Sequence, residues 1–488
     1  MAHQSDLIAE NIEQYLKEHE NKEILRFITC GSVDDGKSTL IGRLLYDSKM
    51  IFEDQLAAIE QDSKKSGTTG DKIDLALLVD GLASEREQGI TIDVAYRFFS
   101  TEKRKFIIAD TPGHEQYTRN MATGASTADV AIILIDARQG ILTQTKRHSY
   151  IASLLGIKNL IVAINKMDLV DFSQDTFEEI KKGYQEIIPN LPHNEDINFE
   201  YIPLSALDGD NILTNSPKCS WYEGLPLMKL LDAVPIHHDE NDDFRLPVQY
   251  VSRPHLNFRG FSGTIASGTI SVGDEITVLP SRKTSVVKSI VSNEIKDLRP
   301  IGKDETVETM ETAFAPMATT LTLKDEIDIS RGDMIVKSSS IPHVSNKLEV
   351  MVVWMDEKKL ELDSNYIIKR STSVINGTFK KIDYKKDANS FEEIQTDSLV
   401  LNDIAKCTLS LDRQIAVDPY NENRHTGSFI IIDRYTNSTV GAGMILSSVA
   451  NEDVDKDEKL RVYTKAEIEL NTYIRSNYPE WECKEILG

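Results

Sequence analysis

The N-terminal part of the chain is built around a glycine-rich segment, Gly31-Ser32-Val33-Asp34-Asp35-Gly36-Lys37-Ser38. It follows the apolar run 24–28 and continues into Thr39-Leu40-Ile41, so it lies where a strand leads into a helix. Glycines allow backbone N–H groups to turn around a polyphosphate, and the start of a helix adds partial positive charge. The segment therefore predicts a phosphate-binding loop, with a chance glycine turn before a helix as the alternative.

Two side chains of this loop have distinct chemistry. Lys37 can reach the outer phosphates of a nucleotide, and the Ser38 hydroxyl is a candidate magnesium ligand. Downstream, Asp110-Thr111-Pro112-Gly113-His114 ends the apolar run 106–109. Asp110 can hold magnesium through water, and the Gly113 N–H can meet a terminal phosphate. The alternative is an ordinary strand followed by a Pro-Gly turn.

A third apolar run ends in Asn165-Lys166-Met167-Asp168. Guanine presents two adjacent N–H donors, which a carboxylate such as Asp168 can accept together, whereas adenine lacks them. Such a contact discriminates between bases by roughly 10⁴-fold, because the wrong base leaves a buried carboxylate unpaired. Asn165 can meet the purine O6/N7 edge, and the stem of Lys166 can cover the ring. The backbone of Ser205-Ala206-Leu207 would close the pocket around O6.

The segment Gly89-Ile90-Thr91-Ile92 lies between the first two motifs. Thr91 could complete a magnesium shell only when the γ-phosphate is present, which would make this segment a ligand-dependent switch. The alternative is a loop before an ordinary strand, because residues 91–99 are rich in strand-forming side chains. The two interpretations are compatible.

The length of 488 residues, with 40% apolar content, indicates about three domains. Short apolar runs alternate with helical stretches up to about residue 236, which is typical of a largely parallel α/β sheet. A charged segment, 237–243, then acts as a linker before two β-rich blocks that we expect to form β-barrels. The predicted units are an N-terminal helical extension (1–23), the α/β domain (24–236), two barrels (244–338 and 345–449) and a partly helical tail (450–488).

Individual strands are expected where short runs of strand-forming residues are bounded by turns. The candidates in the α/β domain are 106–109, 130–135 and 159–164, those in the first barrel are 246–251, 260–266, 269–272 and 275–279, and those in the second are 348–354, 405–411, 429–433 and 440–446.

Charge and cysteine content exclude several classes of protein. Lys and Arg number 55 against 78 Asp and Glu, a net charge of -23, which argues against a general nucleic-acid coat protein or a binder of anionic membranes, although local basic patches remain possible. The apolar runs are strand-sized, so no membrane segment is expected. The four cysteines form no Cys-x-x-Cys pair, so we expect neither zinc nor disulfides, and a cytoplasmic location. They are Cys30, Cys219, Cys407 and Cys483.

Together these motifs resemble the translational GTPases of the elongation factor Tu type, which implies a P-loop GTPase domain followed by two β-barrels. Within that superfamily the chain is more similar to the large, GTP-hydrolysing subunit of bacterial heterodimeric ATP sulfurylase, the sulfate adenylyltransferase subunit 1 family. Three segments carry this similarity: 29–45, 85–98 with Gln88 where elongation factors usually carry arginine, and 253–260.

The resemblance implies roles for individual residues. His114 would orient the attacking water, and Val33 and Ile90 would restrict its access, since phosphoryl transfer depends on positioning. With Lys37 these form the expected catalytic set, and the expected magnesium ligands are Ser38, Thr91 and Asp110. The expected GTP-binding residues are Gly31, Ser32, Val33, Asp34, Asp35, Gly36, Lys37, Ser38, Thr39, Asp110, Thr111, Pro112, Gly113, His114, Asn165, Lys166, Met167, Asp168, Ser205, Ala206 and Leu207.

The family resemblance also implies a function and a partner. A separate small catalytic subunit would convert ATP and sulfate to adenosine 5′-phosphosulfate and pyrophosphate, driven by GTP and Mg²⁺ on this chain. One alternative is a translation factor that delivers tRNA or acts on the ribosome, but the acidic segments 239–243 and 451–458 argue weakly against RNA binding. Another is a GTP-binding scaffold that never turns over.

Overall fold

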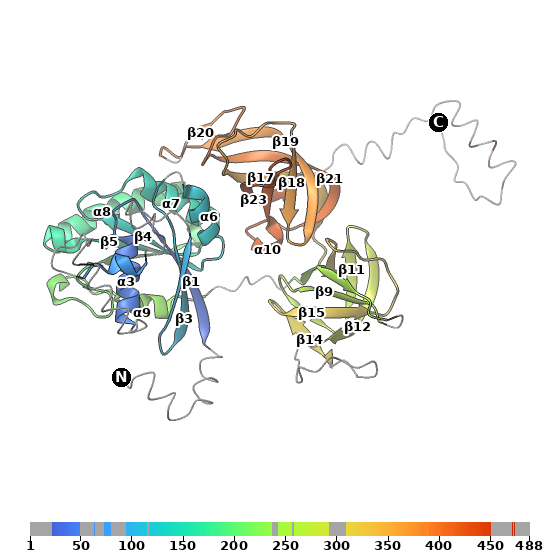
Figure 1. Cartoon of the computed structure of the whole chain (residues 1–488), viewed down its shortest axis with the longest axis horizontal. Coiled ribbons are helices and arrows are strands. Elements are labelled where there is room, and N and C mark those ends of the chain that lie inside the picture. The colour runs from blue at the N-terminus through green and yellow to red at the C-terminus, as the bar shows by residue number, and fades with distance from the viewer. Residues whose placement is uncertain are drawn as a thin grey trace, which may run out of the picture.

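The computed structural model describes residues 22–48, 63, 73–79, 94–114, 117–236, 243–255, 258–291, 309–387, 389–449, 471 and 473. An α/β domain is followed by two β-barrels, which confirms the predicted fold class (Figure 1). The N-terminal extension up to residue 21, the switch segment 89–92, linker residues 237–242 and nearly all of the tail lie outside the described residues. The domain boundaries stay predictions.

The α/β domain has a six-stranded sheet in the order β2-β3-β1-β4-β5-β6. All neighbouring strands are parallel except β2 and β3, which are antiparallel. The carboxyl ends of β1, β3 and β5 therefore meet at one edge, where the three motifs lie. The strands are β1 (Glu23–Cys30), β2 (Ala95–Ser100), β3 (Arg104–Asp110), β4 (Val130–Asp136), β5 (Asn159–Asn165) and β6 (Asn198–Pro203).

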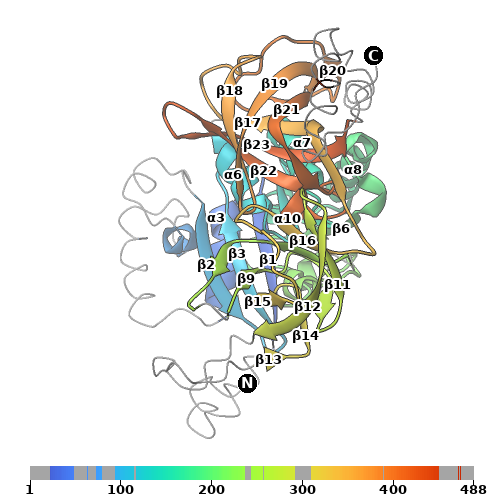
Figure 2. The same ribbon diagram turned by 90° about the vertical axis from the view of Figure 1, so that its right-hand side faces the viewer.

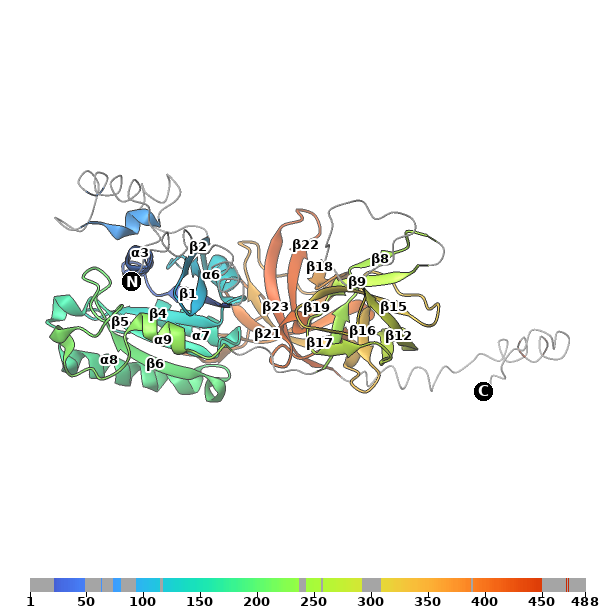
Figure 3. The same ribbon diagram turned by 90° about the horizontal axis from the view of Figure 1, so that it is seen from below.

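Helices cover both faces of this sheet. Apolar residues of α6, α7 and α8 pack on one face, and those of α3 and α9 pack on the other; Figure 3 shows α3 and α8 on opposite sides of the sheet. Because β4 is buried on both faces, it is a continuous apolar run rather than an alternating one. The helices are α3 (Lys37–Asp47), α6 (Thr118–Ala125), α7 (Thr143–Leu154), α8 (Gln174–Ile187) and α9 (Leu227–Ala233), with 3-10 turns η1 (Leu75–Leu78), η3 (Met167–Val170), η4 (Ile188–Asn190), η5 (Asn194–Asp196) and η6 (Pro217–Cys219).

No helix in the described ranges has the length and apolar character that crossing a membrane requires.

The first barrel follows the strand path β7-β16-β11-β12-β15-β9-β8, and a bridge between Arg245 and Ser267 links β7 back to the segment after β9. The single strand predicted for 246–251 is wrong. It is two strands, because β7 pairs with β16 whereas β8 pairs with β9. The strands are β7 (Arg245–Pro247), β8 (Tyr250–Ser252), β9 (Gly260–Thr264), β10 (Thr269–Ser271), β11 (Glu275–Leu279), β12 (Lys283–Val291), β13 (Thr309–Met310), β14 (Thr312–Phe314), β15 (Ala318–Leu323) and β16 (Met334–Lys337).

The second barrel is closed, because the path β18-β22-β23-β17-β21-β19 returns through pairing of β19 with β18. The four predicted strands fall within β17, β21, β22 and β23 and are confirmed. Its elements are β17 (His343–Trp354), β18 (Asn365–Arg370), β19 (Ser373–Lys386), β20 (Glu393–Ile394), β21 (Ile404–Val417), α10 (Arg424–Gly427), β22 (Ser428–Asp433) and β23 (Thr439–Ser448).

The second barrel contacts both other domains. The Tyr420 hydroxyl donates to the carbonyl of Leu155 at 3.1 Å, and the ring of Tyr150 on α7 stacks on Phe391 with centroids 5.9 Å apart. Apolar residues of this barrel share one buried cluster with the α/β domain, and both Figure 1 and Figure 2 show the barrel next to α6 and α7. Between the barrels, the amide of Asn423, which caps α10, donates to the Ser267 hydroxyl at 2.9 Å.

Candidate nucleotide-binding site

The glycine-rich loop has the backbone conformation that a phosphate-binding loop needs. Gly36 precedes α3 with a φ of 92°, a left-handed conformation that favours glycine. Among the described residues no side chain caps the start of α3, so its first N–H groups remain available to an anion. A Cβ atom on Gly36 would lie 2.5 Å from the Asn165 amide nitrogen, which also excludes larger residues there.

Lys37 lies inside this loop. Its Nζ donates to the carbonyl of Gly31 at 3.2 Å and to that of Ser32 at 2.6 Å. Burial lowers the pKa of Lys37, and the nearby carboxylates of Asp35 and Asp110 partly offset that effect. The ammonium group is thus held where the phosphates are predicted to bind.

Asp35 stabilises the same loop from within. Its carboxylate accepts the N–H of Ser32. Burial raises the pKa of Asp35, while Lys37 and the hydrogen bond from Ser32 act in the opposite direction. The conformation of the loop is therefore supported by a side chain that the sequence analysis gave only as a GTP-binding residue.

The segment after β3 packs directly on the loop. Asp110 is buried at the strand end, and the Thr111 hydroxyl donates to the carbonyl of Thr29 at 2.7 Å. A Cβ atom on Gly113 would lie 2.5 Å from the Lys37 Nζ and 3.0 Å from the Gly31 carbonyl oxygen, so a larger residue would displace the lysine or the loop. The His114 ring lies edge-on to Tyr117, with centroids 6.4 Å apart.

Asn165 joins the phosphate loop to the third motif. Its amide nitrogen donates to the carbonyl of Asp35 at 2.7 Å, and its amide oxygen accepts the N–H of Ala206 at 2.9 Å. Both polar atoms are thus engaged by protein groups, and Asn165 positions the 205–207 segment. Its predicted contact with the purine edge stays a prediction.

Lys166 and Asp168 differ in their partners. The Lys166 Nζ lies 3.1 Å from the carboxylate of Asp136 and also donates to the carbonyl of Asp34. Burial alone would raise the pKa of Asp136, but hydrogen bonds from Arg138 and Lys166 outweigh it and lower the pKa to about 2. The carboxylate of the half-buried Asp168, by contrast, makes no hydrogen bond or ion pair with any residue that the structure describes.

Two residues that support the site are not apparent from the motifs. Arg43 on α3 donates through Nε to the carbonyl of Ala206 at 3.2 Å and through a guanidinium nitrogen to that of Leu207. The buried His148 on α7 accepts the N–H of Gly31 at Nδ1, at 3.1 Å. Both lie mid-helix, where no spacing signal distinguishes them from ordinary surface or core positions.

His148 is neutral in the folded protein. Burial, followed by the positive charge of Lys37, lowers its pKa from 6.5 to about 3. Only the neutral ring can accept at Nδ1, so the structure fixes its tautomer with the proton on Nε2.

The residues near the loop suit magnesium better than a transition metal. The Ser38 hydroxyl makes no hydrogen bond to the described part of the chain, and the Asp110 carboxylate is close enough to influence Lys37. No group of three or more His, Cys, Asp or Glu side chains in that part could hold a metal. Mg²⁺ is usually held by one or two protein oxygens together with water and phosphates, so this donor set fits it.

The three described motifs meet at one edge of the sheet, as expected for parallel strands. Ile90 and Thr91 lie outside the described residues, so their positions relative to His114 and Ser38 are not defined. The functional role of each predicted site residue stays a prediction. The predicted residues not discussed individually above, Val33, Thr39, Pro112, Met167 and Ser205, belong to these same motifs.

Comparison with known proteins supports this picture. Residues 22–239 match the elongation factor Tu GTP binding domain, and residues 347–446 match the GTP-eEF1A C-terminal domain-like family. The sulfate adenylyltransferase subunit 1 of Sulfurovum sp. is 61% identical over 100% of both chains. That of Aliarcobacter butzleri is 59% identical over 98% of both chains, and that of Saccharophagus degradans is 56% identical over 100% of this chain and 99% of its own.

These identities extend over the whole length of the chain, through both barrels as well as the nucleotide-binding motifs. The chain therefore belongs to the sulfate adenylyltransferase subunit 1 family and carries an elongation factor Tu-type GTP-binding domain.

Proposed function

We propose that the protein is the GTP-hydrolysing subunit of a sulfate adenylyltransferase. GTP hydrolysis on this chain would drive the formation of adenosine 5′-phosphosulfate and pyrophosphate from ATP and sulfate at a separate small catalytic subunit. Family membership and the GTP-binding domain support this proposal.

The observation that carries GTP selection is the state of Asp168. Its carboxylate is half-buried after β5 and is free of hydrogen bonds to the described residues, whereas Asn165 and Lys166 are already engaged. A guanine ring satisfies such a carboxylate with two N–H donors. Adenine would leave it desolvated and unpaired, which is costly.

The residues of the loop have complementary roles in this proposal. Backbone N–H groups and Lys37 hold the phosphates, and His114 orients the attacking water. Val33 and Ile90 restrict the access of that water. Ser38 and Asp110, with Thr91, would hold Mg²⁺, which neutralises phosphate charge when bound.

The proposed coupling requires that the GTP and GDP states differ in affinity for the partner or its intermediates. One pair of contacts supports coupling: the second barrel packs on α7, and α7 carries His148 against Gly31 of the phosphate loop. We also propose a cytoplasmic location, which the free, buried thiols of Cys30, Cys219 and Cys407 support.

Nucleotide choice can be tested by changing one atom. In Asp168→Asn the side chain presents an amide N–H donor, which suits the C2 carbonyl of xanthine. We expect GTP affinity to fall roughly 100-fold or more and XTP affinity to rise, measured by titration calorimetry. Asp171→Asn changes an exposed neighbour in a left-handed conformation that Asn tolerates, and should leave the preference unchanged. Equal binding of GTP and ATP by the wild-type protein would contradict the proposal.

Coupling is tested with the small subunit present. Adenosine 5′-phosphosulfate formation from ATP and sulfate should rise with GTP, and in the Asp168→Asn complex it should rise with XTP instead. If adenosine 5′-phosphosulfate formation does not change with the added nucleotide in either complex, coupling is refuted.

A translation factor would need positive charge on its barrels to bind RNA, and the most lysine-rich strand of the second barrel, β19, does not supply it. Four lysines on β19 each lie beside a carboxylate, so the strand presents little net positive charge to a phosphate backbone. The pairs are Lys380–Asp363 at 3.0 Å, Lys381–Asp383 at 2.6 Å, Lys385–Asp403 at 3.3 Å and Lys386–Glu393 at 3.1 Å. A tRNA-binding assay should show no saturable binding.

A further inference from the structure

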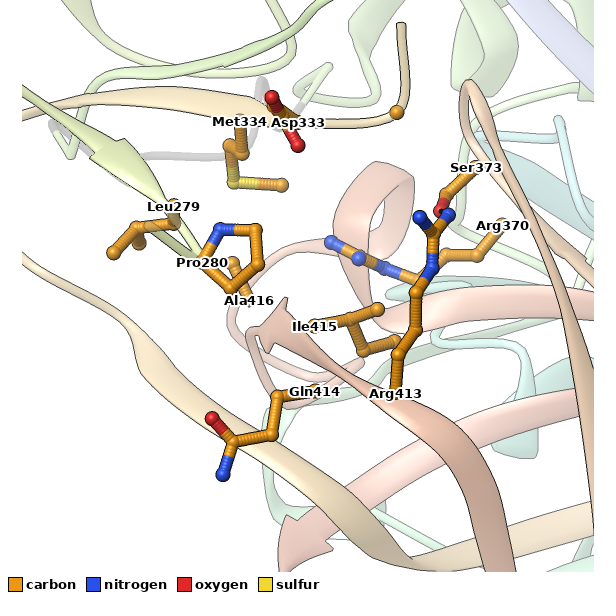
Figure 4. A pocket seen from close by; sticks show the side chains of 11 residues that line it. Leu279, Pro280, Asp333, Met334, Arg370, Ser373, Arg413, Gln414, Ile415 and Ala416 are labelled. Carbon is orange, nitrogen blue, oxygen red and sulfur yellow. Dashed lines mark hydrogen bonds between the residues drawn. The ribbon is translucent and has the colours of Figure 1, made fainter. Parts of the chain in front are cut away.

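A hollow with an empty volume of about 280 Å³ lies between the two barrels (Figure 4). The first barrel contributes an apolar wall that includes Leu279, Pro280 and Met334. The second barrel contributes Ile415 and Ala416 together with polar side chains. The hollow therefore exists only when the barrels are docked.

Arg370 of the second barrel points into this hollow. The residue is only 4% exposed, and its Nε donates to the carbonyl of Thr426 at 2.6 Å. One of its guanidinium nitrogens, Nη2, is buried without a hydrogen-bond partner among the described residues. A buried cationic donor in this state calls for an acceptor.

The carboxylate whose charge acts on Arg370 is that of Asp418, and it already has other hydrogen-bond partners. Asp418 is buried, and it accepts hydrogen bonds from Arg245 at 3.0 to 3.2 Å and from the Thr426 hydroxyl at 2.6 Å. Asp418 is thus hydrogen-bonded to Arg245 and acts on Arg370 through its charge, and the half-exposed Asp243 also lies 3.3 Å from Arg245. Burial lowers the pKa of Arg370 to about 10, with Asp418 acting in the opposite direction, so it remains charged at neutral pH.

Two ionisable side chains of opposite sign also line the hollow. The exposed Arg413 donates to the Ser373 hydroxyl at 3.1 Å, and Figure 4 shows its guanidinium beside Ser373. Asp333 lines the opposite wall and accepts the N–H of Ser330 at 2.8 Å. Burial raises the pKa of Asp333, and the charge of Arg413 partly offsets that effect.

We propose that the hollow between the barrels binds a small inorganic anion through Arg370 and Arg413. A bound anion would accept a hydrogen bond from Arg370 Nη2, and its negative charge would balance the positive charge of Arg370. The volume of about 280 Å³ includes space open to solvent and is still below the roughly 300–1,000 Å³ that is typical of drug-sized ligand pockets, so a chloride, sulfate or phosphate ion fits better than a nucleotide. The bound anion would stabilise the docked arrangement of the two barrels.

The test is thermal unfolding of the full chain, without nucleotide, at constant ionic strength. Sodium gluconate, whose anion is bulky, is replaced stepwise by sodium chloride, sulfate or phosphate, one salt per series. We expect a saturable rise in melting temperature with at least one of these ions. Because the empty phosphate loop can also bind sulfate or phosphate, the series whose dependence changes in Arg413→Gln identifies the anion of the hollow.

Three single variants make the test specific. Arg413→Gln alters an exposed side chain and should weaken the apparent anion affinity roughly tenfold or more, because a charge-assisted contact is lost. Asp333→Asn removes a negative charge from the hollow, keeps an acceptor for Ser330 and should strengthen the affinity. Lys369→Gln removes an exposed charge from the neighbouring position on β18 and should leave the affinity unchanged.

The outcomes are distinct. Saturable stabilisation that weakens in Arg413→Gln and strengthens in Asp333→Asn supports the site. Absence of an anion effect, or the same dependence in Arg413→Gln as in the wild-type protein, overturns it. Because no nucleotide is used, failure here is separate from failure of the proposed GTPase function.

Discussion

The nucleotide edge of the α/β domain and the junction between the barrels are both rich in buried charge, but they are assembled differently. At the nucleotide edge, the predicted polar groups belong to short motifs that end strands, and Arg43 and His148 support them from helices. At the junction, Arg245 and Asp418 form a buried pair across 173 positions of sequence. The first region can be recognised from local patterns, because a parallel sheet brings its strand ends together. The second depends on how two separate barrels dock.

The largest effect on stability is expected from a substitution in the buried pair between the barrels. Asp418→Ala removes the buried carboxylate that is hydrogen-bonded to Arg245 and whose charge acts on Arg370, so we expect a loss of roughly 3–5 kcal/mol in the free energy of unfolding, measured by urea denaturation. Asp412→Ala removes an exposed carboxylate that accepts from Asn376, and should change stability by less than about 0.5 kcal/mol. Similar values for both variants would show that the junction does not depend on the buried pair.

A smaller effect is expected at the nucleotide edge. In Gly113→Ala the added methyl group meets Lys37 Nζ and the backbone of the phosphate loop, so overpacking should cost about 1–3 kcal/mol. Because that cost falls on the loop, GTP affinity should drop roughly tenfold or more in calorimetry. Gly183→Ala on α8 meets only the flexible end of Ile141, and normal GTP affinity is expected there. Unchanged affinity in Gly113→Ala would mean that the loop tolerates displacement.

The buried His148 on α7, which accepts the N–H of Gly31, makes the stability of the protein depend on pH. The folded-state pKa of His148, about 3, lies below its ordinary value of 6.5. The unfolded chain therefore binds a proton between these values that the folded protein does not, and stability is lost as the pH falls below 6.5. Between pH 7 and pH 5 the wild-type protein should lose about 2 kcal/mol more than His148→Gln, which cannot titrate.

Denaturation of both proteins at several pH values measures this difference directly. Parallel pH profiles for the wild-type protein and His148→Gln would show that His148 is protonated, or not buried, in the folded chain.

The smallest effect is expected on the surface of the second barrel. Lys380 and Asp363 form an ion pair at 3.0 Å, but both side chains are at least half exposed. Lys380→Gln should change the free energy of unfolding by at most about 0.5 kcal/mol. A loss above 1 kcal/mol would indicate that surface pairs on β19 contribute as the buried junction does.

Sequence patterns predicted some strands of the two barrels and missed others. The runs 348–354 and 405–411 were recognisable because their apolar residues dominate. β19 was not, because Lys380, Lys381, Lys385 and Lys386 interrupt its apolar pattern with charge. The run 246–251 reads as one strand because nothing local indicates that the chain changes partner after Pro247.

By itself, the sequence determined the fold class and the three clusters of polar residues at the ends of β1, β3 and β5. It did so because the chemistry of each cluster is contained in consecutive residues and a parallel sheet aligns strand ends. Only the tertiary structure decided that His148 accepts from Gly31, that Arg43 holds the 205–207 segment, and that Arg370 faces a hollow between barrels. These contacts join residues that are far apart in the chain. Packing alone brings such residues together, so no local sequence pattern predicts the contacts.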